Sequence, residues 1–334
     1  MAPPVLGLDI GGTKLAVGMV GEDGRVDRLL IEPTRREEGA RRVLERLFAM
    51  GREVVDAAGL GAPTAVGISC GGPLDATTGV LLNPPHLPGW IDVPVVAMAA
   101  EVFDVPVFLE NDATAAALGE YMFGAGTGTS TLVYLTVSTG VGGGAVIDGR
   151  LHRGAAGNGG ELGHITVRPE GRSCTCGRRG CLEAYCSGTQ IARRAEEAVD
   201  VAVRTGRPTT LADVPAMTAA DVSRAAAAGD QVAREVWDET TALLGQGVTD
   251  LVNVFEPDVV VLGGGVTRAG SMLLDPVREI VRHQAMGPAA RAARVVLAGL
   301  GDAVGVVGAG AVALDALREQ DHCGALVPAT SYPA

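Results

Sequence analysis

The sequence has few aromatic residues, no long apolar run and no basic stretch. Aromatic side chains make up 3% of its 334 residues, and no segment reaches the roughly 20 apolar residues that a membrane-spanning helix needs. The formal net charge is −12, which opposes binding to phosphate backbones. The N-terminus lacks the basic and apolar regions of a signal peptide. We therefore predict a cytoplasmic protein without membrane or nucleic-acid partners.

A Walker A motif is also missing, because G-x-x-x-x-G-K-[ST] occurs nowhere in the chain. The six cysteines are not spread out as in a secreted disulfide framework. Instead, Cys174, Cys176 and Cys181 lie close together, with Cys186 just beyond. Such clustering in a reducing compartment indicates a metal site. Glycine, by contrast, is abundant at 48 residues, which indicates that it has positional uses in turns.

Glycine-rich turns join two pairs of predicted strands. Residues 5–20 are typical of a strand, the turn IGGTK and a second strand, and residues 132–147 repeat this arrangement around STGVGGG. Together with the chain length, the repeat predicts a duplicated α/β unit and two domains. A strand and not a helix follows STGVGGG, so this turn is not a dinucleotide-binding fingerprint.

The remaining pattern predicts alternating helices and strands. Helices are expected at residues 38–58, 113–123, 187–205, 232–252, 272–283 and 305–319, strands at 65–69, 105–109, 259–265 and 294–298, and a short hairpin that closes near residue 79.

A polar trio, Glu110-Asn111-Asp112, stands where a predicted strand meets a predicted helix. In α/β proteins, ligands bind at the carboxyl ends of strands. A carboxylate placed there can orient a hydroxyl and accept its proton during phosphoryl transfer. Asp is also a preferred helix N-cap. Both roles are open for Asp112 at this point.

The segment Asp9–Lys14 lies where two predicted strands meet. Its glycines can bring backbone N–H groups close to phosphate oxygens, while Thr13 adds a hydroxyl and Asp9 would face a magnesium ion. An ordinary glycine-rich hairpin is the alternative. Glycine-rich sequences also occur at the ends of two later predicted strands, at Ser138–Gly144 and Gly263–Gly265. The predicted nucleotide contacts are Asp9, Gly11, Gly12, Thr13, Lys14, Thr139, Gly140, Gly264 and Gly265.

His164 with three cysteines forms the pattern H-x9-C-x-C-x4-C. Three thiolates and one imidazole fill every position of a tetrahedral structural zinc. The predicted ligands are His164, Cys174, Cys176 and Cys181, and we expect the zinc to fix the loop around them. A disulfide is the alternative, but Cys174 and Cys176 are too close in sequence to pair well. Cys186 is expected to be buried and not a fifth ligand.

Five motifs, DIGGTK, LENDA, STGVGGG, GGELGH and CTCGRRGCLE, resemble in this order the ROK family of bacterial sugar kinases and repressors. The resemblance runs from about Leu6 to about Leu317. It implies an actin-like, ribonuclease H-like sugar kinase fold of two α/β domains around a cleft, and a homodimer or homotetramer. We expect a small domain of residues 1–110 plus about 302–320, a large domain of residues 111–301 that carries the zinc loop, and a loosely ordered tail at 321–334.

The resemblance also implies roles for single residues. In the family the acidic residue of the N-D motif takes the proton of the sugar hydroxyl, and here that residue is Asp112. His86 and Thr114 depart from the family pattern, which commonly has Asn at each position, and they leave the identity of the sugar open. The expected sugar-binding residues are Gly72, His86, Asn111, Asp112, Glu161, His164 and Glu183.

These assignments imply transfer of the γ-phosphate of ATP, with Mg²⁺, to a hexose hydroxyl, most simply glucose to glucose 6-phosphate. N-acetylmannosamine, N-acetylglucosamine, fructose and a cyclitol are alternative acceptors. A sugar-sensing regulator is the competing class, but the first strand is expected at Val5, which leaves no room for a helix-turn-helix domain before it. A generic actin-like ATPase would leave the cysteine cluster and the sugar motifs unexplained.

Overall fold

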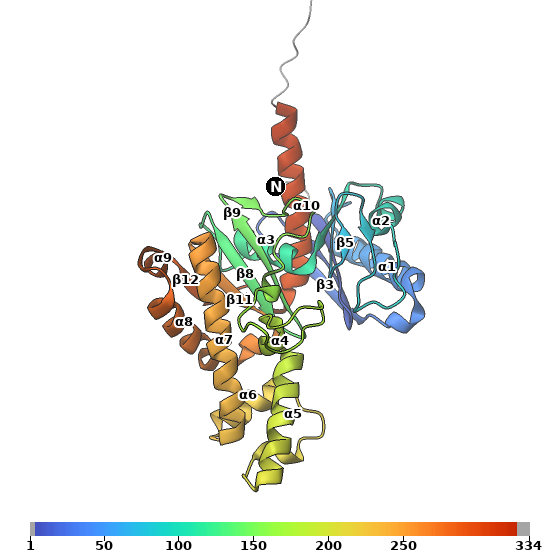
Figure 1. The fold of residues 1–334 in the computed structure, drawn as a ribbon. Coiled ribbons are helices and arrows are strands. Elements are labelled where there is room, and N and C mark those ends of the chain that lie inside the picture. The colour runs from blue at the N-terminus through green and yellow to red at the C-terminus, as the bar shows by residue number, and fades with distance from the viewer. Residues whose placement is uncertain (1–3, 326–334) are drawn as a thin grey trace, which may run out of the picture. The chain divides into compact units, whose positions relative to one another are not determined.

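The computed structural model describes residues 4–325, and these form two α/β units (Figure 1). The first unit holds the residues up to Phe123 together with those from Leu300 onward, and the second holds Gly124–Gly299. Among the described residues, no helix is both long and apolar enough to cross a membrane.

The first unit contains a five-stranded mixed sheet. Its strands are β1 (Val5–Ile10), β2 (Lys14–Val20), β3 (Val26–Pro33), β4 (Val66–Cys70) and β7 (Val107–Asn111). They lie in the order β3-β2-β1-β4-β7. β1 pairs antiparallel with β2 and parallel with β4, and β4 pairs parallel with β7. The carboxyl ends of β1, β4 and β7 therefore lie at the same edge. A short hairpin of β5 (Leu74–Asp75) and β6 (Val80–Leu81) follows β4.

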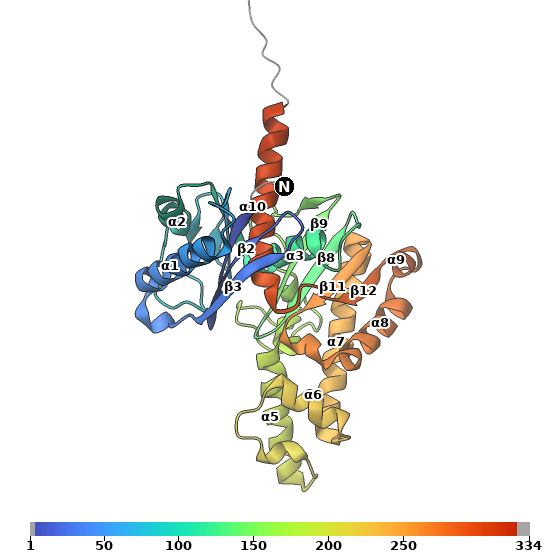
Figure 2. The same cartoon turned by 180° about the vertical axis from the view of Figure 1, so that it is seen from behind.

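Helices cover both faces of this sheet (Figures 1 and 2). They are α1 (Ala40–Ala58) and α2 (Val95–Phe103) on one face, and α3 (Asp112–Phe123) and α10 (Val304–Ala325) on the other. The buried side chains of α1, among them Val43, Leu47 and Val54, recur at helical spacing and pack on the sheet. Because both faces are covered, β4 is buried along its whole length.

The second unit repeats the sheet of the first. Its strands are β8 (Leu132–Val137), β9 (Val141–Ile147), β10 (Arg150–Leu151), β11 (Val259–Gly263) and β12 (Arg294–Leu297). The order β10-β9-β8-β11-β12 and the strand directions match those of the first sheet position by position. This correspondence confirms the duplicated α/β unit that the two glycine-rich turns predicted.

Helices make up most of the remainder of the second unit. They are α4 (Glu183–Cys186), α5 (Gly188–Thr205), α6 (Ala219–Ala227), α7 (Gln231–Phe255), α8 (Ser271–Gln284) and α9 (Gly287–Ala292). α7 packs against α8, and α5 and α6 pack against α7 (Figure 2). Side chains of these helices share one apolar core with β8 and β11, including Leu135, Leu244, Leu262 and Val277. α7 begins at the side-chain cap of Asp230, whose carboxylate accepts the N–H of Ala233.

The unit boundaries differ from those predicted. The sequence placed the first boundary at residue 110, whereas the structure keeps α3, and with it Asp112, in the first unit. The reason is the close contact of α3 with α10: a Cβ atom on Gly308 would lie 2.7 Å from the carbonyl oxygen of Ala115. The tail was expected from residue 321, but α10 continues through Ala325. The rest of that predicted tail, residues 326–334, lies outside the described residues.

Candidate functional site

The parallel strands of the first unit gather polar side chains at their carboxyl ends. Asp9 on β1 lies opposite Ser69 on β4, and Ser69 lies opposite Glu110 on β7. The Ser69 hydroxyl donates a hydrogen bond to Asp9 Oδ1 at 2.7 Å. Asn111 ends β7 and Asp112 begins α3. The strand-to-helix junction was thus predicted correctly, and it lies at the sheet edge where ligands are expected.

The structure separates the two roles that were open for Asp112. Asn111 Oδ1 accepts the N–H groups of Ala113 at 3.0 Å and Thr114 at 3.2 Å, so Asn111 caps α3. Thr114 is buried behind this cap. Asp112 lies within the first turn, accepts the N–H of Ala113 through Oδ1 at 2.8 Å, and stays accessible to solvent. The cap function therefore belongs mainly to Asn111, and the Asp112 carboxylate is accessible to a ligand.

Both carboxylates of this edge hold protons more tightly than usual. Partial burial raises the pKa of Asp9 to about 6, against the lowering effect of the Ser69 hydrogen bond, and the nearby Asp112 raises it further. Loss of hydration also raises the pKa of Asp112, which the Ala113 N–H and the charge of His86 counteract. Two neighbouring carboxylates with raised pKa values form a place where a cation or a substrate proton is accepted favourably.

We expect Asp9→Asn to raise the free energy of unfolding at pH 7 by about 1–3 kcal/mol. The pKa of Asp9 is raised from the 3.8 of an ordinary aspartate to about 6 in the folded chain, so the folded state binds a proton at Asp9 more tightly than the unfolded state does. Tighter proton binding by Asp9 stabilises the folded wild type fully below about pH 4, and this stabilisation is lost as the pH rises through about 6. Urea denaturation in metal-free buffer should therefore show the variant gaining over wild type across this interval.

Asp56→Asn, on the exposed side of α1, is the matched control and should follow wild type at every pH. The free energy of unfolding of Asp9→Asn could equal that of wild type, or differ from it by the same amount between about pH 4 and 7. Either result would show that the ionised Asp9 carboxylate does not destabilise the folded protein.

His86 lies beside the same sheet edge. A Cβ atom on Gly71 would lie 2.5 Å from His86 Cε1, so the imidazole rests directly on this glycine. His86 Nε2 is 4.0 Å from Cys70 Sγ, and the His86 carbonyl accepts a hydrogen bond from Arg36 at 3.4 Å. Burial lowers the pKa of His86, against the raising effect of Asp112. Burial therefore favours the neutral form of the ring.

The predicted sugar-binding residues of the first unit come together. Gly72 follows Gly71, and a Cβ atom on Gly72 would lie 3.6 Å from Asn111 Nδ2. The charge of Asp112 influences His86. Gly72, His86, Asn111 and Asp112 therefore form one group within this unit.

The first glycine-rich turn lies next to His86, since a Cβ atom on Gly12 would be 3.2 Å from His86 Cβ. The Gly11 N–H is already bonded to the Lys14 carbonyl at 3.0 Å, and the Thr34 hydroxyl donates to the Gly11 carbonyl at 2.6 Å. Thr13 and Lys14 are exposed. The turn can therefore present Gly12 and Thr13 to a phosphate, whereas the Gly11 N–H serves the turn itself.

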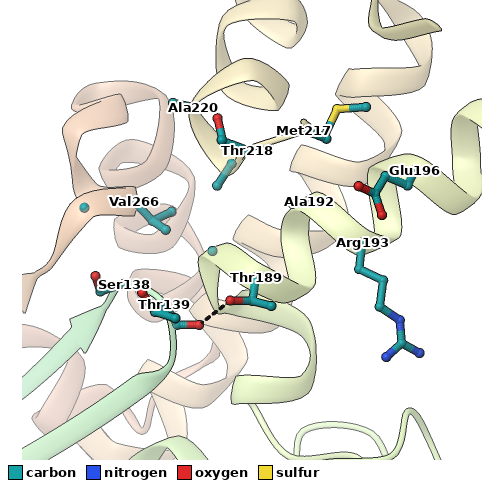
Figure 3. A pocket seen from close by; sticks show the side chains of 13 residues that line it. Ser138, Thr139, Thr189, Ala192, Arg193, Glu196, Met217, Thr218, Ala220 and Val266 are labelled. Carbon is teal, nitrogen blue, oxygen red and sulfur yellow. Dashed lines mark hydrogen bonds between the residues drawn. The ribbon is translucent and has the colours of Figure 1, made fainter. Parts of the chain in front are cut away.

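In the second unit, a pocket of about 580 Å³ opens beside the second glycine-rich turn (Figure 3). The turn contributes Ser138 and Thr139, and the segment after β11 contributes Gly265 and Val266. Gly264 directly precedes them. The sequence missed the rest of the lining, which comes from α5 and from the start of α6: Gly188, Thr189, Ala192, Arg193, Glu196, Met217, Thr218, Ala219 and Ala220.

The predicted metal ligands converge in the second unit. One donor atom from each of His164, Cys174, Cys176 and Cys181 lies within 4.8 Å of the others. The Sγ atoms of Cys176 and Cys181 are 3.7 Å apart, and Cys174 Sγ is 3.6 Å from His164 Nδ1. Zn–S bonds of about 2.3 Å in a tetrahedron place the sulfur atoms about 3.8 Å apart. The donor set and its spacing therefore fit a four-coordinate zinc.

The thiols of this cluster shift in opposite directions. Burial, together with the neighbouring thiols, raises the pKa of Cys181 to about 12, whereas the backbone N–H of Arg178 lowers the pKa of Cys176. A metal binds the deprotonated form of each ligand. Cys186 is buried away from the cluster, and its Sγ lies 3.5 Å from the Thr240 carbonyl oxygen. This position confirms the expectation for Cys186.

The predicted sugar contacts of the second unit surround the same cluster. His164 turns Nδ1 toward Cys174, while its Nε2 lies 3.7 Å from Glu161 Oε2. One ring nitrogen can thus serve a metal and the other a polar ligand. Glu161 is exposed. Glu183, half-buried at the start of α4, accepts the Val141 N–H at 3.0 Å.

Comparisons with known proteins agree on one family. The ROK family model matches residues 5–316. A glucokinase of Thermotoga maritima is 38% identical over 309 residues, which is 92% of this chain and 96% of that protein. The crystal structure of a ROK hexokinase from Thermus thermophilus has 37% identity and a TM-score of 0.79, covering 95% of this chain and 99% of that one. A ROK family glucokinase from Streptomyces griseus, in complex with glucose and AMPPNP, has 34% identity and a TM-score of 0.78, covering 93% and 99%.

Proposed function

Because the chain belongs to the ROK family and has the fold of its sugar kinases, we propose that it is an ATP-dependent hexokinase that converts glucose to glucose 6-phosphate. The observation that carries the proposal is the accessible carboxylate of Asp112 at the carboxyl edge of the first sheet. The chain that presents it is similar over nearly its whole length to a hexokinase and to glucokinases.

We assign the proton-accepting role to Asp112. In the transfer, the acceptor hydroxyl oxygen bonds to the γ-phosphorus, the bond from the γ-phosphorus to the bridging oxygen breaks, ADP leaves, and the hydroxyl proton passes to the carboxylate. The raised pKa of Asp112 brings this base closer to the working pH and so favours proton acceptance. Asn111 fixes the backbone around Asp112 by capping α3.

We propose that Asp9 faces the Mg²⁺ of the nucleotide, which would neutralise phosphate charge during transfer. Its carboxylate lies on a rigid strand end and is held by the Ser69 hydroxyl. Oxygen ligands of this kind suit Mg²⁺. The exposed Thr13 and Lys14 would contact phosphate oxygens from the adjoining turn.

We propose that the pocket of about 580 Å³ in the second unit receives the adenosine part of ATP. Its walls combine apolar side chains, such as Met217 and Val266, with Arg193 and Glu196 (Figure 3). Apolar walls with a few polar groups are typical of sites for a base and its ribose. We propose that Thr139 and Gly265, which line the pocket, and the adjoining Gly140 and Gly264 contact the phosphates.

Within the second unit we propose sugar-hydroxyl contacts from Glu161, His164 and Glu183. Within the first unit we propose such contacts from Gly72, His86 and Asn111. A carboxylate can accept hydrogen bonds from two adjacent hydroxyls. We further propose a structural zinc held by the His164 and cysteine cluster, since the donor spacing fits the ion. The zinc would orient the loop that carries these contacts.

Coupled measurement of ADP release tests the proposal. With ATP and Mg²⁺, the purified protein should turn over glucose with a kcat/KM about tenfold or more above that for mannose, fructose, the two N-acetylhexosamines and cyclitols. ADP release without sugar should be negligible. A higher kcat/KM for another acceptor would overturn glucose as the substrate and leave the kinase assignment standing. Absence of sugar-dependent ADP release with every acceptor would overturn the kinase and favour a sugar-sensing regulator.

A further inference from the structure

One carboxylate in the second unit contacts both the metal-ligand loop and the glycine-rich turn. Glu183 Oε2 accepts the N–H of Val141, at the start of β9, at 3.0 Å. Glu183 Oε1 lies 3.6 Å from Cys174 Sγ and accepts a hydrogen bond from the Thr175 hydroxyl at 3.4 Å. A single side chain therefore bridges the predicted zinc loop and the turn of residues 138–144.

The contact between Glu183 and the turn requires glycine at position 140. A Cβ atom there would lie 2.8 Å from Glu183 Oε2, well inside van der Waals contact. With hydrogen alone on this Cα, the backbone approaches the carboxylate closely enough for the neighbouring Val141 N–H to donate to it.

The chain that follows Glu183 holds the same turn at two further points. The Gly188 N–H donates to the Ser138 carbonyl at 2.6 Å, and the Thr189 hydroxyl donates to the Thr139 carbonyl at 2.9 Å. Every one of these three anchors comes from the short segment that follows the metal ligand Cys181. The conformation of the turn is therefore set by the position of this segment.

The segment cannot adjust independently, because α4 is fixed in the core. Its residues Ala184, Tyr185 and Cys186 are buried. The buried guanidinium of Arg194 donates to the Tyr185 carbonyl and to the Thr240 hydroxyl, each at 2.9 Å. A rigid α4 leaves the Glu183 side chain as the link through which a change in the loop of Cys174 and Thr175 reaches the turn.

We propose that Glu183 is a positioning residue that couples the His164 and cysteine cluster to the nucleotide-binding turn, so that an ordered metal loop raises nucleotide affinity even without sugar. The inference rests on the proposed function, because it assigns the turn to nucleotide binding. It gives Glu183 a role separate from a sugar contact. The Thr175 hydroxyl orients one carboxylate oxygen, and the other then holds Val141 in the conformation that the nucleotide requires.

Titration calorimetry with AMPPNP and Mg²⁺, without sugar, tests this coupling. Glu183→Ala should weaken nucleotide binding about five- to tenfold, because the Val141 N–H loses its acceptor. Glu183→Gln keeps an acceptor oxygen and should stay within about twofold of wild type. Glu161→Ala removes a carboxylate beside the same cluster that has no bond to the turn, and it should leave nucleotide affinity unchanged.

A double-mutant comparison tests the link to the metal. Cys176→Ser, which removes one ligand, should weaken nucleotide binding in the wild-type background and should weaken it much less in the Glu183→Ala background. Zinc content, measured on every variant, should stay at the wild-type level in Glu183→Ala. If Glu183→Ala does not fold, Thr175→Val, which removes the hydroxyl that donates to Glu183 Oε1, provides the same comparison.

The outcomes separate the inference from the proposed function. If wild type binds no nucleotide, the proposed kinase function fails. If wild type binds it and Glu183→Ala binds it equally well, or if the Cys176→Ser effect is the same in both backgrounds, the coupling is overturned and Glu183 acts on the sugar alone.

Discussion

Asp112→Asn should lower kcat for sugar phosphorylation by about 10²- to 10⁴-fold, the range that a positioned general base contributes. The amide cannot accept the hydroxyl proton at neutral pH. Its oxygen can still accept the Ala113 N–H, as Asp112 Oδ1 does at 2.8 Å, and the Asn111 cap on α3 stays intact. We therefore expect the fold and the KM for glucose to change little. Steady-state ADP release and glucose titration calorimetry measure these quantities separately.

Asp104→Asn is a matched control for this substitution. Asp104 is an exposed carboxylate of the same unit and ends α2 in the left-handed region at φ 54°, a conformation that asparagine tolerates well. It should retain wild-type kcat. An Asp112→Asn enzyme with wild-type kcat would refute the assignment of the base, and a variant that loses glucose binding along with turnover would show that the carboxylate acts mainly in binding.

Cys176→Ser should produce the second large effect, the loss of bound zinc. Tetrahedral structural sites need all four ligands, and zinc binding of this kind contributes about 10–16 kcal/mol in small zinc domains. Cys176 is exposed, so the substitution itself disturbs little packing. We expect zinc content to fall from about one ion per chain to near zero, glucose affinity to fall with it, and the melting temperature to drop. Elemental analysis and calorimetry measure these changes.

The neighbouring Cys186 supplies the control for the metal experiment. It is buried at the end of α4, with its Sγ near the Thr240 carbonyl and outside the ligand cluster. A serine hydroxyl can keep that contact, so Cys186→Ser should retain zinc. Wild-type protein that contains no zinc after purification without chelators, or a Cys176→Ser variant that keeps it, would contradict the proposed site.

Most of the fold was predictable because strand patterns and glycine-rich turns coincide in both units. The very short β10, α4 and α9 were not predicted, and three longer elements were missed for physical reasons. β3 is an edge strand whose apolar Leu29 and Ile31 are exposed, so its pattern does not distinguish a buried face. α2 is an almost continuous apolar run, which does not distinguish a helix from a strand. α6 is short and follows a loop, although Thr218 and Asp221 form a capping box that indicates its start.

The candidate site was predictable in its chemistry and less so in its geometry. The sequence placed Asp112 at a strand end but did not show that Asn111 would cap the helix, because that depends on the backbone of the junction. The pocket residues Ala192, Arg193 and Glu196 were missed, since their helix looked like a packing element and its partner segment in α6 was not predicted. Spatial neighbours from separate segments leave no local pattern.

The two matched sheets differ in one connection between their strands. In the first unit, a short connection leads along the chain from β3 to β4, and its main helix is α1. The equivalent crossover in the second unit, from β10 to β11, holds the cysteine loop and all of α4 to α7. The same connection thus carries one main helix in the first unit and the cysteine loop with four helices in the second, while the strand framework is the same in both.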